Sequence, residues 1–203
     1  PVILITSSMP SEGKTFASIN LASAYSLVGK KTVLVGFDLR KPKIYNDFNI
    51  NNDKGVSTYL IGQNTVEEII NDTGYQNLWV IPAGPVPPNP AELAASAKTR
   101  ELFDELKKRF DYIVIDSAPL GSVSDSFSLA AASDITVILV RHNVTIKHVL
   151  QNAVSDAKSN GINSMSLLLN DISRERTIYG YTGRYKYGYG YGYETYTNGN
   201  GKT

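Results

Sequence analysis

Residues 2–15 read Val-Ile-Leu-Ile-Thr-Ser-Ser-Met-Pro-Ser-Glu-Gly-Lys-Thr, and this stretch decides the fold class. Its apolar start predicts a buried strand, and helix-forming residues follow its final threonine. A strand, a loop ending in Gly-Lys-Thr and a helix form a cradle for phosphate, because the backbone N–H groups of loop and helix point at the anion. A chance Gly-Lys-Thr in a surface loop would lack this context. We therefore predict that residues 8–15 bind a nucleoside triphosphate, although Ser8 replaces the usual first glycine.

The residue types of this loop divide the work of holding ATP and Mg²⁺. Gly13 permits close approach of the backbone, Lys14 can reach the β- and γ-phosphates, and the Thr15 hydroxyl can ligate Mg²⁺. The predicted ATP-binding residues in the loop and first helical turn are Ser11, Glu12, Gly13, Lys14, Thr15 and Phe16.

Composition places the chain among ordinary soluble globular proteins. It has 203 residues, 42% hydrophobic and 19% charged, which suits one α/β domain with a substantial core. The absence of cysteine excludes disulfides and thiolate metal sites, and a net charge of +1 gives no reason to expect nucleic acid as a partner. No apolar run reaches membrane-spanning length. Because a strand begins directly after Pro1, we expect the chain to be a piece of a longer protein.

Short apolar runs alternate with helical patterns, which predicts βαβ units and a doubly wound, mainly parallel sheet flanked by helices, as in P-loop nucleotide-binding proteins. The predicted strands are rich in Val, Ile and Leu without clean alternation, as expected for strands buried on both faces. They span residues 2–6, 32–37, 78–82, 112–116, 135–141 and 164–170. The predicted helices span residues 14–28, 66–71, 99–110, 124–132 and 146–159, and segments 41–58 and 83–97 are looser.

Polar residues stand at the carboxyl ends of these strands, where ligands bind in α/β sheets. Asp38 follows the second predicted strand, Asp116 ends the fourth, and Arg141 and Asn170 end the last two. Lys14, Asp38 and Asp116 are the predicted catalytic residues, because phosphoryl transfer needs charge neutralisation and a proton acceptor. Thr15, Asp38 and Asp116 are the predicted Mg²⁺ ligands, and Arg141 and Asn170 are further ATP-binding candidates.

Each of these assignments has a purely structural alternative. Asp116 could cap a helix, and Asp38 could form an ion pair with Arg40 or Lys41. Arg141 and Asn170 could satisfy backbone groups at the strand ends.

The end of the chain has a different composition from the rest. Residues 173–203 carry a net charge of +3 against −2 for residues 1–172, so we predict a domain over 1–172 and a flexible tail over 173–203. Tyrosine and glycine dominate the tail, which could be a phosphate acceptor, a low-complexity linker or an aromatic nucleic-acid-binding segment. Its tyrosines are Tyr179, Tyr181, Tyr185, Tyr187, Tyr189, Tyr191, Tyr193 and Tyr196.

Taken together, these motifs resemble those of the bacterial tyrosine kinases, the cytoplasmic kinase modules of polysaccharide chain-length regulators. Residues 8–15 resemble the family's Walker A motif, residues 37–42 its Walker A′ motif and residues 113–119 its Walker B motif. Residues 86–93, Val-Pro-Pro-Asn-Pro-Ala-Glu-Leu, resemble another typical segment, and the eight tail tyrosines resemble its autophosphorylation cluster.

This resemblance implies ATP- and Mg²⁺-dependent phosphorylation of the tail by a neighbouring copy in a ring, coupled to capsule or exopolysaccharide export. It also implies a cytoplasmic domain joined to, or activated by, a membrane-embedded co-polymerase portion. One departure affects the chemistry, because Gly36 replaces the first aspartate of the usual Asp-x-Asp in Walker A′. Any task of that carboxylate falls on Asp38 or is missing.

Two other functions remain open at this point. A partitioning or septum-positioning ATPase shares the fold, but such proteins typically carry a second lysine early in the loop, where this chain has Met9. A catalytically silent ATP-binding module is favoured by Gly36.

Overall fold

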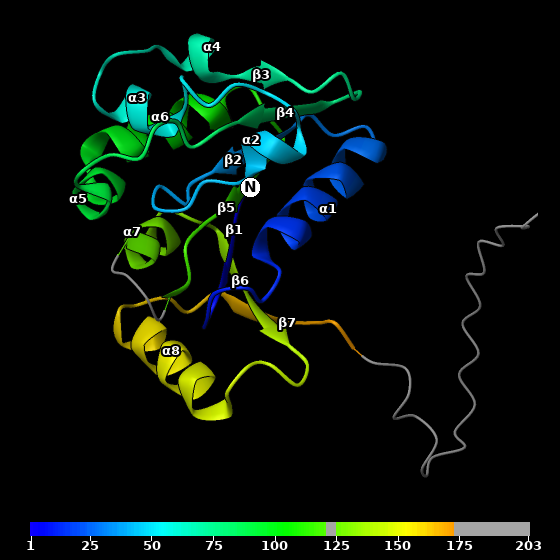
Figure 1. The fold of residues 1–203 in the computed structure, drawn as a ribbon, viewed down its shortest axis with the longest axis vertical. Helices are drawn as coiled ribbons and strands as arrows, with labels where there is room; N and C mark the ends of the chain where they lie inside the picture. Colours follow the sequence, from blue (N-terminus) through cyan, green and yellow to red (C-terminus); the bar gives the residue numbers. More distant parts are fainter. Residues whose placement is uncertain (121–124, 173–203) are drawn as a thin grey trace, which may run out of the picture. The chain divides into compact units, whose positions relative to one another are not determined.

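Parallel strands form the centre of the molecule in a computed structural model that describes residues 1–120 and 125–172. Across the sheet their order is β3-β4-β2-β5-β1-β6-β7, and β3 runs antiparallel to β4 (Figure 1). The strands are β1 (Val2–Ser7), β2 (Thr32–Gly36), β3 (Asn71–Asp72), β4 (Leu78–Ile81), β5 (Tyr112–Asp116), β6 (Ile135–Arg141) and β7 (Met165–Asn170). The six predicted strands and the doubly wound fold are therefore confirmed.

Helices follow the strands, as the sequence predicts, but three short ones occur in or next to segments predicted to be loose. The helices are α1 (Lys14–Leu27), α2 (Ile44–Asp47), α3 (Val56–Leu60), α4 (Val66–Ile69), α5 (Pro90–Ala95), α6 (Ala97–Lys107), α7 (Asp125–Ala131) and α8 (Lys147–Ser159). Proline is tolerated at the first position of a helix, which is where Pro90 stands in α5. The helix predicted over 66–71 ends early, because Asn71 and Asp72 pair with β4 as β3.

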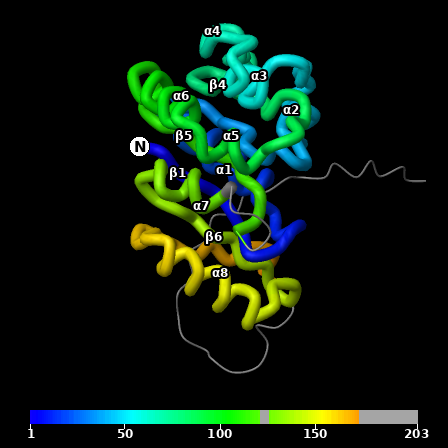
Figure 2. The backbone as a smooth tube through the Cα atoms, turned by 90° about the vertical axis from the view of Figure 1, so that its left-hand side faces the viewer, coloured from blue at the N-terminus to red at the C-terminus, as the bar shows by residue number. Residues whose placement is uncertain are grey.

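Side chains alternate between the two faces of the sheet, and both faces are covered. Val2 and Leu4 point to the face packed by α6 and α7, whereas Ile3 and Ile5 point to the face packed by α1. Figure 2 looks toward the first of these faces and shows α6, α7 and α8 following one another along it. Because β1, β2, β4 and β5 are buried on both sides, their sequences lack alternation.

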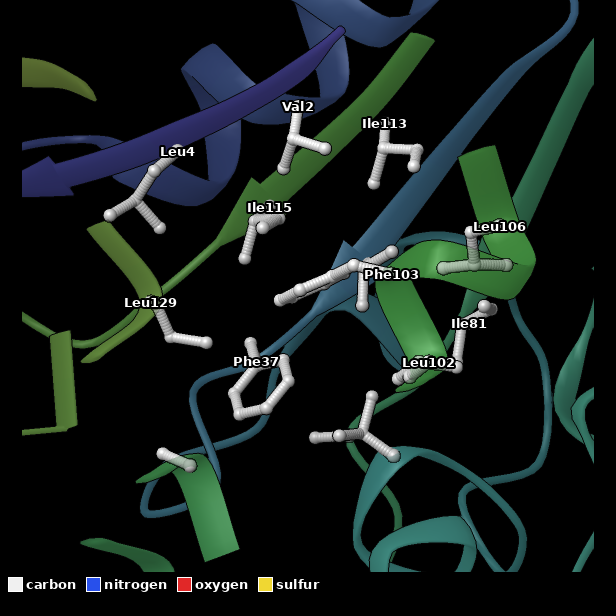
Figure 3. Packing of buried hydrophobic residues seen from close by; sticks show 14 of the residues in the cluster. Val2, Leu4, Phe37, Ile81, Leu102, Phe103, Leu106, Ile113, Ile115 and Leu129 are labelled. Atoms are coloured by element: carbon white, nitrogen blue, oxygen red, sulfur yellow. The ribbon is translucent and has the colours of Figure 1, made fainter. Parts of the chain in front are cut away.

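The larger core cluster lies between α6 and the sheet. Leu102, Phe103 and Leu106 on α6 are almost completely buried, so the helix predicted over 99–110 packs an apolar stripe against the sheet. Figure 3 shows the Phe103 ring beside Phe37, and the two ring centroids are 6.0 Å apart. Phe37 directly follows β2, so this packing fixes the chain just before Asp38.

β7 departs from the prediction that every strand is buried on both faces. It pairs with β6 at one end of the sheet, and Leu167, Leu168 and Leu169 are 61%, 45% and 51% exposed. A strand at the end of a sheet has a neighbouring strand on one side only. The apolar sequence of β7 does not reveal that it occupies this end position. None of the described helices is long and apolar enough to cross a membrane.

Candidate nucleotide-binding site

The loop between β1 and α1 holds a conformation that only glycine can complete. Ser11 and Gly13 both have left-handed backbones, with φ of 65° and 98°. A Cβ atom at position 13 would lie 2.3 Å from the Asn170 Nδ2 atom, so a side chain there would displace the Asn170 amide and would strain the left-handed backbone. α1 begins at Lys14, so the N–H groups of its first turn face the end of the loop. This is the geometry of a phosphate-binding loop.

Lys14 is held inside the site rather than in solvent. Its side chain is 9% exposed, and its Nζ donates a hydrogen bond of 3.0 Å to Ser7 Oγ at the end of β1. Burial lowers the pKa of Lys14, while the nearby carboxylates of Asp116, Asp38 and Glu12 act in the opposite direction. The ammonium group is therefore short of solvation and surrounded by acceptors, which favours its interaction with an incoming anion.

Asp116 is a buried carboxylate that depends on two hydroxyl groups. It is 4% exposed, accepts a hydrogen bond of 2.8 Å from Thr15 Oγ1 and lies 3.5 Å from Ser18 Oγ. These contacts to α1 differ from the helix-capping contact considered from the sequence. Burial raises the pKa of Asp116 to about 6, although Thr15, Lys14 and Ser18 oppose the shift. A hydroxyl and a carboxylate oxygen this close form a ligand pair that suits Mg²⁺.

Asp38 is oriented by the backbone that follows it. Its Oδ1 accepts hydrogen bonds from the backbone N–H groups of Arg40 and Lys41, at 3.2 Å and 3.0 Å. These are the two residues considered from the sequence as ion-pair partners. The turn therefore fixes the half-buried carboxylate at the mouth of the site.

A pocket of about 830 Å³ brings most of the predicted residues together. This volume lies within the range of small-molecule sites, which is about 300–1,000 Å³. Lys14, Thr15 and Asp38 line it, and Phe16, which is 68% exposed, adds an apolar wall. Its remaining lining residues include the predicted Ser11 and Gly13 and the cationic Arg40, Lys41 and Lys43.

Among the described residues, three predicted ATP-binding residues do not line this pocket but hold its loop. Arg141 Nη1 donates a hydrogen bond of 3.0 Å to the Ser11 carbonyl, and Asn170 Nδ2 donates one of 3.0 Å to the Glu12 carbonyl. Glu12 itself is fully buried. Arg141 and Asn170 therefore satisfy backbone groups, as the structural alternative proposed, and the backbone groups belong to the phosphate loop.

Sequence reasoning missed three hydroxyl residues at the site: Ser7, Ser18 and Thr145. Ser18 follows Thr15 by three residues on a predicted helix, so its position on the same face was available as a signal. Thr145 lies in a loop far along the chain and contacts Glu12 through its hydroxyl. No rule of sequence spacing links Thr145 to Glu12, so this contact could not be predicted.

Gly36 lies close to both aspartates. A cavity of about 10 Å³ is lined by residues that include Gly36, Asp38, Lys43 and Asp116. A Cβ atom at position 36 would lie 3.3 Å from the Ala83 backbone nitrogen, which requires a shift of a few tenths of an ångström. The backbone at Gly36 has no left-handed φ, so a larger residue meets no conformational penalty there.

The fold and the loop define a P-loop nucleotide-binding protein. A family model described as an AAA domain matches residues 2–163. The chain is 31% identical over 185 residues to tyrosine-protein kinase CpsD of Streptococcus agalactiae, covering 91% of this chain and 81% of CpsD. It is 33% identical over 185 residues to tyrosine-protein kinase Wzc of Salmonella typhimurium, of which it spans only 26%. This chain belongs to the bacterial tyrosine-protein kinase family.

Solved structures agree with this assignment. The kinase domain of Escherichia coli tyrosine kinase ETK superposes with a TM-score of 0.83 at 29% identity, covering 91% of this chain and 72% of that domain. The MinD cell division protein of Aquifex aeolicus has a TM-score of 0.70 at 21% identity, covering 85% of this chain and 70% of MinD. That likeness shows the shared fold alone.

We predict that Asp116→Asn stabilises the ligand-free protein at pH 7.5 by up to about 3 kcal/mol, because it removes a desolvated charge. The folded-state pKa of about 6 lies above the ordinary aspartate pKa of about 4 expected for the unfolded chain. The contribution of Asp116 to the free energy of unfolding is therefore fully present below the unfolded-state pKa, and it is lost as the pH rises through the folded-state pKa. Urea unfolding in EDTA at pH 7.5 and pH 4.5 tests this, and the gain at pH 4.5 is expected to be about half or less. A gain that does not change with pH contradicts the assignment.

Proposed function

We propose that this chain is an ATP- and Mg²⁺-dependent protein-tyrosine kinase that phosphorylates the tyrosine cluster of its own tail. The observation that carries the proposal is the Thr15–Asp116 pair beside the phosphate loop, in a chain whose relatives are named tyrosine-protein kinases. In the reaction, the γ-phosphoryl group of ATP passes to a tyrosine oxygen, the tyrosine loses its proton and ADP leaves.

Residues of the loop and of β5 fit the two ligands. The N–H groups of the loop and the Lys14 ammonium would hold the β- and γ-phosphates, for which the left-handed, side-chain-free backbone at Gly13 leaves space. Thr15 and Asp116 would hold Mg²⁺, which supplies neutralisation of phosphate charge when it is bound. Lys14 would stabilise negative charge that develops on the transferring group.

Asp38 is the candidate proton acceptor for the tyrosine hydroxyl, and it can also support the metal. Its carboxylate is fixed at the pocket by two backbone N–H donors. Because Gly36 supplies no second carboxylate, Asp38 would carry this task by itself.

The proposed acceptors are the eight tyrosines between residues 179 and 196, which lie outside the described residues. We infer that residues 1–172 form the kinase domain and that residues 173–203 form the substrate tail. A tail tyrosine reaching the pocket of a second copy would give phosphorylation in trans within a homo-oligomer. The family relationship supports this arrangement.

Two alternatives are weaker. A partitioning-type ATPase is supported by the MinD-like fold, but CpsD and Wzc, both above 30% identity, are named kinases. A silent ATP-binding module is supported by Gly36 alone. Incubation with labelled ATP separates these functions, since label on tyrosine, free phosphate alone, or neither product is the respective result.

We also infer a membrane-associated role. The chain spans about a quarter of Wzc and about four fifths of CpsD. From the family relationship, we propose that its partner is a membrane-embedded polysaccharide co-polymerase, either in the same chain or as a separate activator, with this domain in the cytoplasm. Phosphorylation of the tail would regulate capsule or exopolysaccharide export.

We expect Lys14→Met to lower tyrosine labelling by at least about 100-fold, because the ammonium group no longer neutralises the transferring phosphate. Labelling by radioactive ATP measures the effect. Lys30→Met is the matched control, since Lys30 is exposed and precedes β2 at the opposite edge of the sheet. Full activity of Lys14→Met would refute the assignment of the loop.

We expect a chain that ends at Ile172 to lose self-labelling and to retain ATP binding. Residues 1–172 form a compact unit, so removal of residues 173–203 leaves the pocket intact. Mixing this shortened chain with full-length Lys14→Met tests transfer in trans, because label on the full-length variant can then come only from the shortened copy. Label on the shortened chain itself would contradict the proposed acceptors.

We expect Gly36→Asp to raise the rate of tyrosine labelling about tenfold or more if the missing carboxylate limits proton transfer. Gly36→Asn is the control, because it fills the same space without the charge. Equal rates for Gly36→Asp and the unsubstituted protein would show that Asp38 suffices.

A further inference from the structure

Glu12 is a buried carboxylate inside the phosphate loop that the proposed chemistry does not use. It is fully buried, lies near the Lys14 ammonium and accepts hydrogen bonds from neutral donors. The Met9 backbone N–H donates to Oε2 at 2.8 Å, and Ser8 Oγ lies 3.2 Å and 3.3 Å from the two oxygens. Thr145 Oγ1 donates to Oε1 and is the partner that comes from outside the loop. A buried charge of this kind requires each of its donors.

Thr145 is presented to Glu12 by a tight turn after β6. Asn143 has a left-handed φ of 60°, and the Thr145 N–H donates to the Arg141 carbonyl at 2.9 Å. In return, the Thr145 hydroxyl accepts a hydrogen bond of 2.7 Å from the Arg141 N–H. Because both bonds of the hydroxyl are committed, its direction toward Glu12 is fixed.

The loop needs such support because its own conformation is unfavourable. Ser11 has a left-handed backbone, which costs free energy for a residue with a side chain and persists only when its surroundings hold it. The contacts from β6, β7 and the turn reach three consecutive residues: Ser11 through Arg141, Glu12 through Thr145, and Gly13 through the packed Asn170 amide.

We propose that Thr145 is a positioning residue, which clamps Glu12 and thereby holds the phosphate loop ready to bind the nucleotide before it arrives. Without the hydroxyl, the one hydrogen bond that Glu12 Oε1 keeps from the described part of the chain is the long bond from Ser8, and the Arg141 N–H loses the Thr145 acceptor. The loop can relieve this by moving Glu12 toward water, which displaces the N–H groups that would face the phosphates. The Arg141–Asp171 ion pair is a weaker part of the support, since both side chains are partly exposed and screened.

The clamp acts on nucleotide binding, and the proposal rests on the proposed function only for the identity of the nucleotide as ATP. We expect Thr145→Val, which keeps the shape and removes the hydroxyl, to weaken ATP affinity about tenfold or more. Its kcat at saturating ATP is expected to stay close to that of the unsubstituted protein, so that the effect falls on KM. Thr145→Ser restores the hydroxyl and is expected to recover most of the affinity.

Thr73→Val is a matched control for the general cost of losing a hydroxyl. Thr73 Oγ1 donates to the Leu78 carbonyl at 2.7 Å and accepts from the Tyr75 N–H, which parallels the two bonds of Thr145. It lies beside β3 and β4, at the far end of the sheet order from β6 and β7. ATP affinity by calorimetry and thermal unfolding are measured for all four proteins.

The outcomes separate the two proposals. If the unsubstituted protein does not bind ATP, the proposed function fails. If it binds ATP and Thr145→Val binds equally well, the clamp is refuted. The clamp is also refuted if Thr73→Val and Thr145→Val lose affinity to the same extent, or if Thr145→Val lowers kcat with KM unchanged.

Discussion

The central position of β1 is the constraint on which the rest of the site depends. β1 pairs in parallel with both β5 and β6, and its register places Ile5 beside Asp116 and Ser7 beside Leu139. The loop after β1 is therefore flanked on one side by Asp116 and on the other by the turn after β6. One strand alignment brings together residues 14, 116 and 145, which are far apart in the sequence.

This arrangement concentrates buried polar groups at the carboxyl ends of the central strands. Glu12, Lys14 and Asp116 are each at most 9% exposed, and burial shifts the pKa of Lys14 down and that of Asp116 up. Desolvation of this kind disfavours the empty site, whereas a polyphosphate and a divalent cation would supply the missing solvation. The same buried charges thus lower the stability of the ligand-free protein and favour the binding of its ligands.

The sequence was sufficient to predict the elements that are determined by local patterns of residues. Apolar runs predicted six strands, and the rule that ligands bind at carboxyl ends placed Asp38 and Asp116 near the loop. It was not sufficient where tertiary contacts decide. The exposure of β7 depends on its place at the end of the strand order, and β3 exists only through pairing with β4. The contact of Thr145 with Glu12 joins residues 133 positions apart, which no periodicity encodes.

The exposed edge at β7 affects how this domain is handled in solution. Its segment Met165–Asn170 contains three consecutive leucines and no charged residue, and among the described residues it pairs with β6 on one side only. Natural edge strands usually carry a lysine, a proline or a bulge that discourages further strands from joining. Concentrated solutions of the isolated domain are therefore expected to self-associate by strand addition at β7. Leu168→Lys is the simplest substitution that would discourage this aggregation.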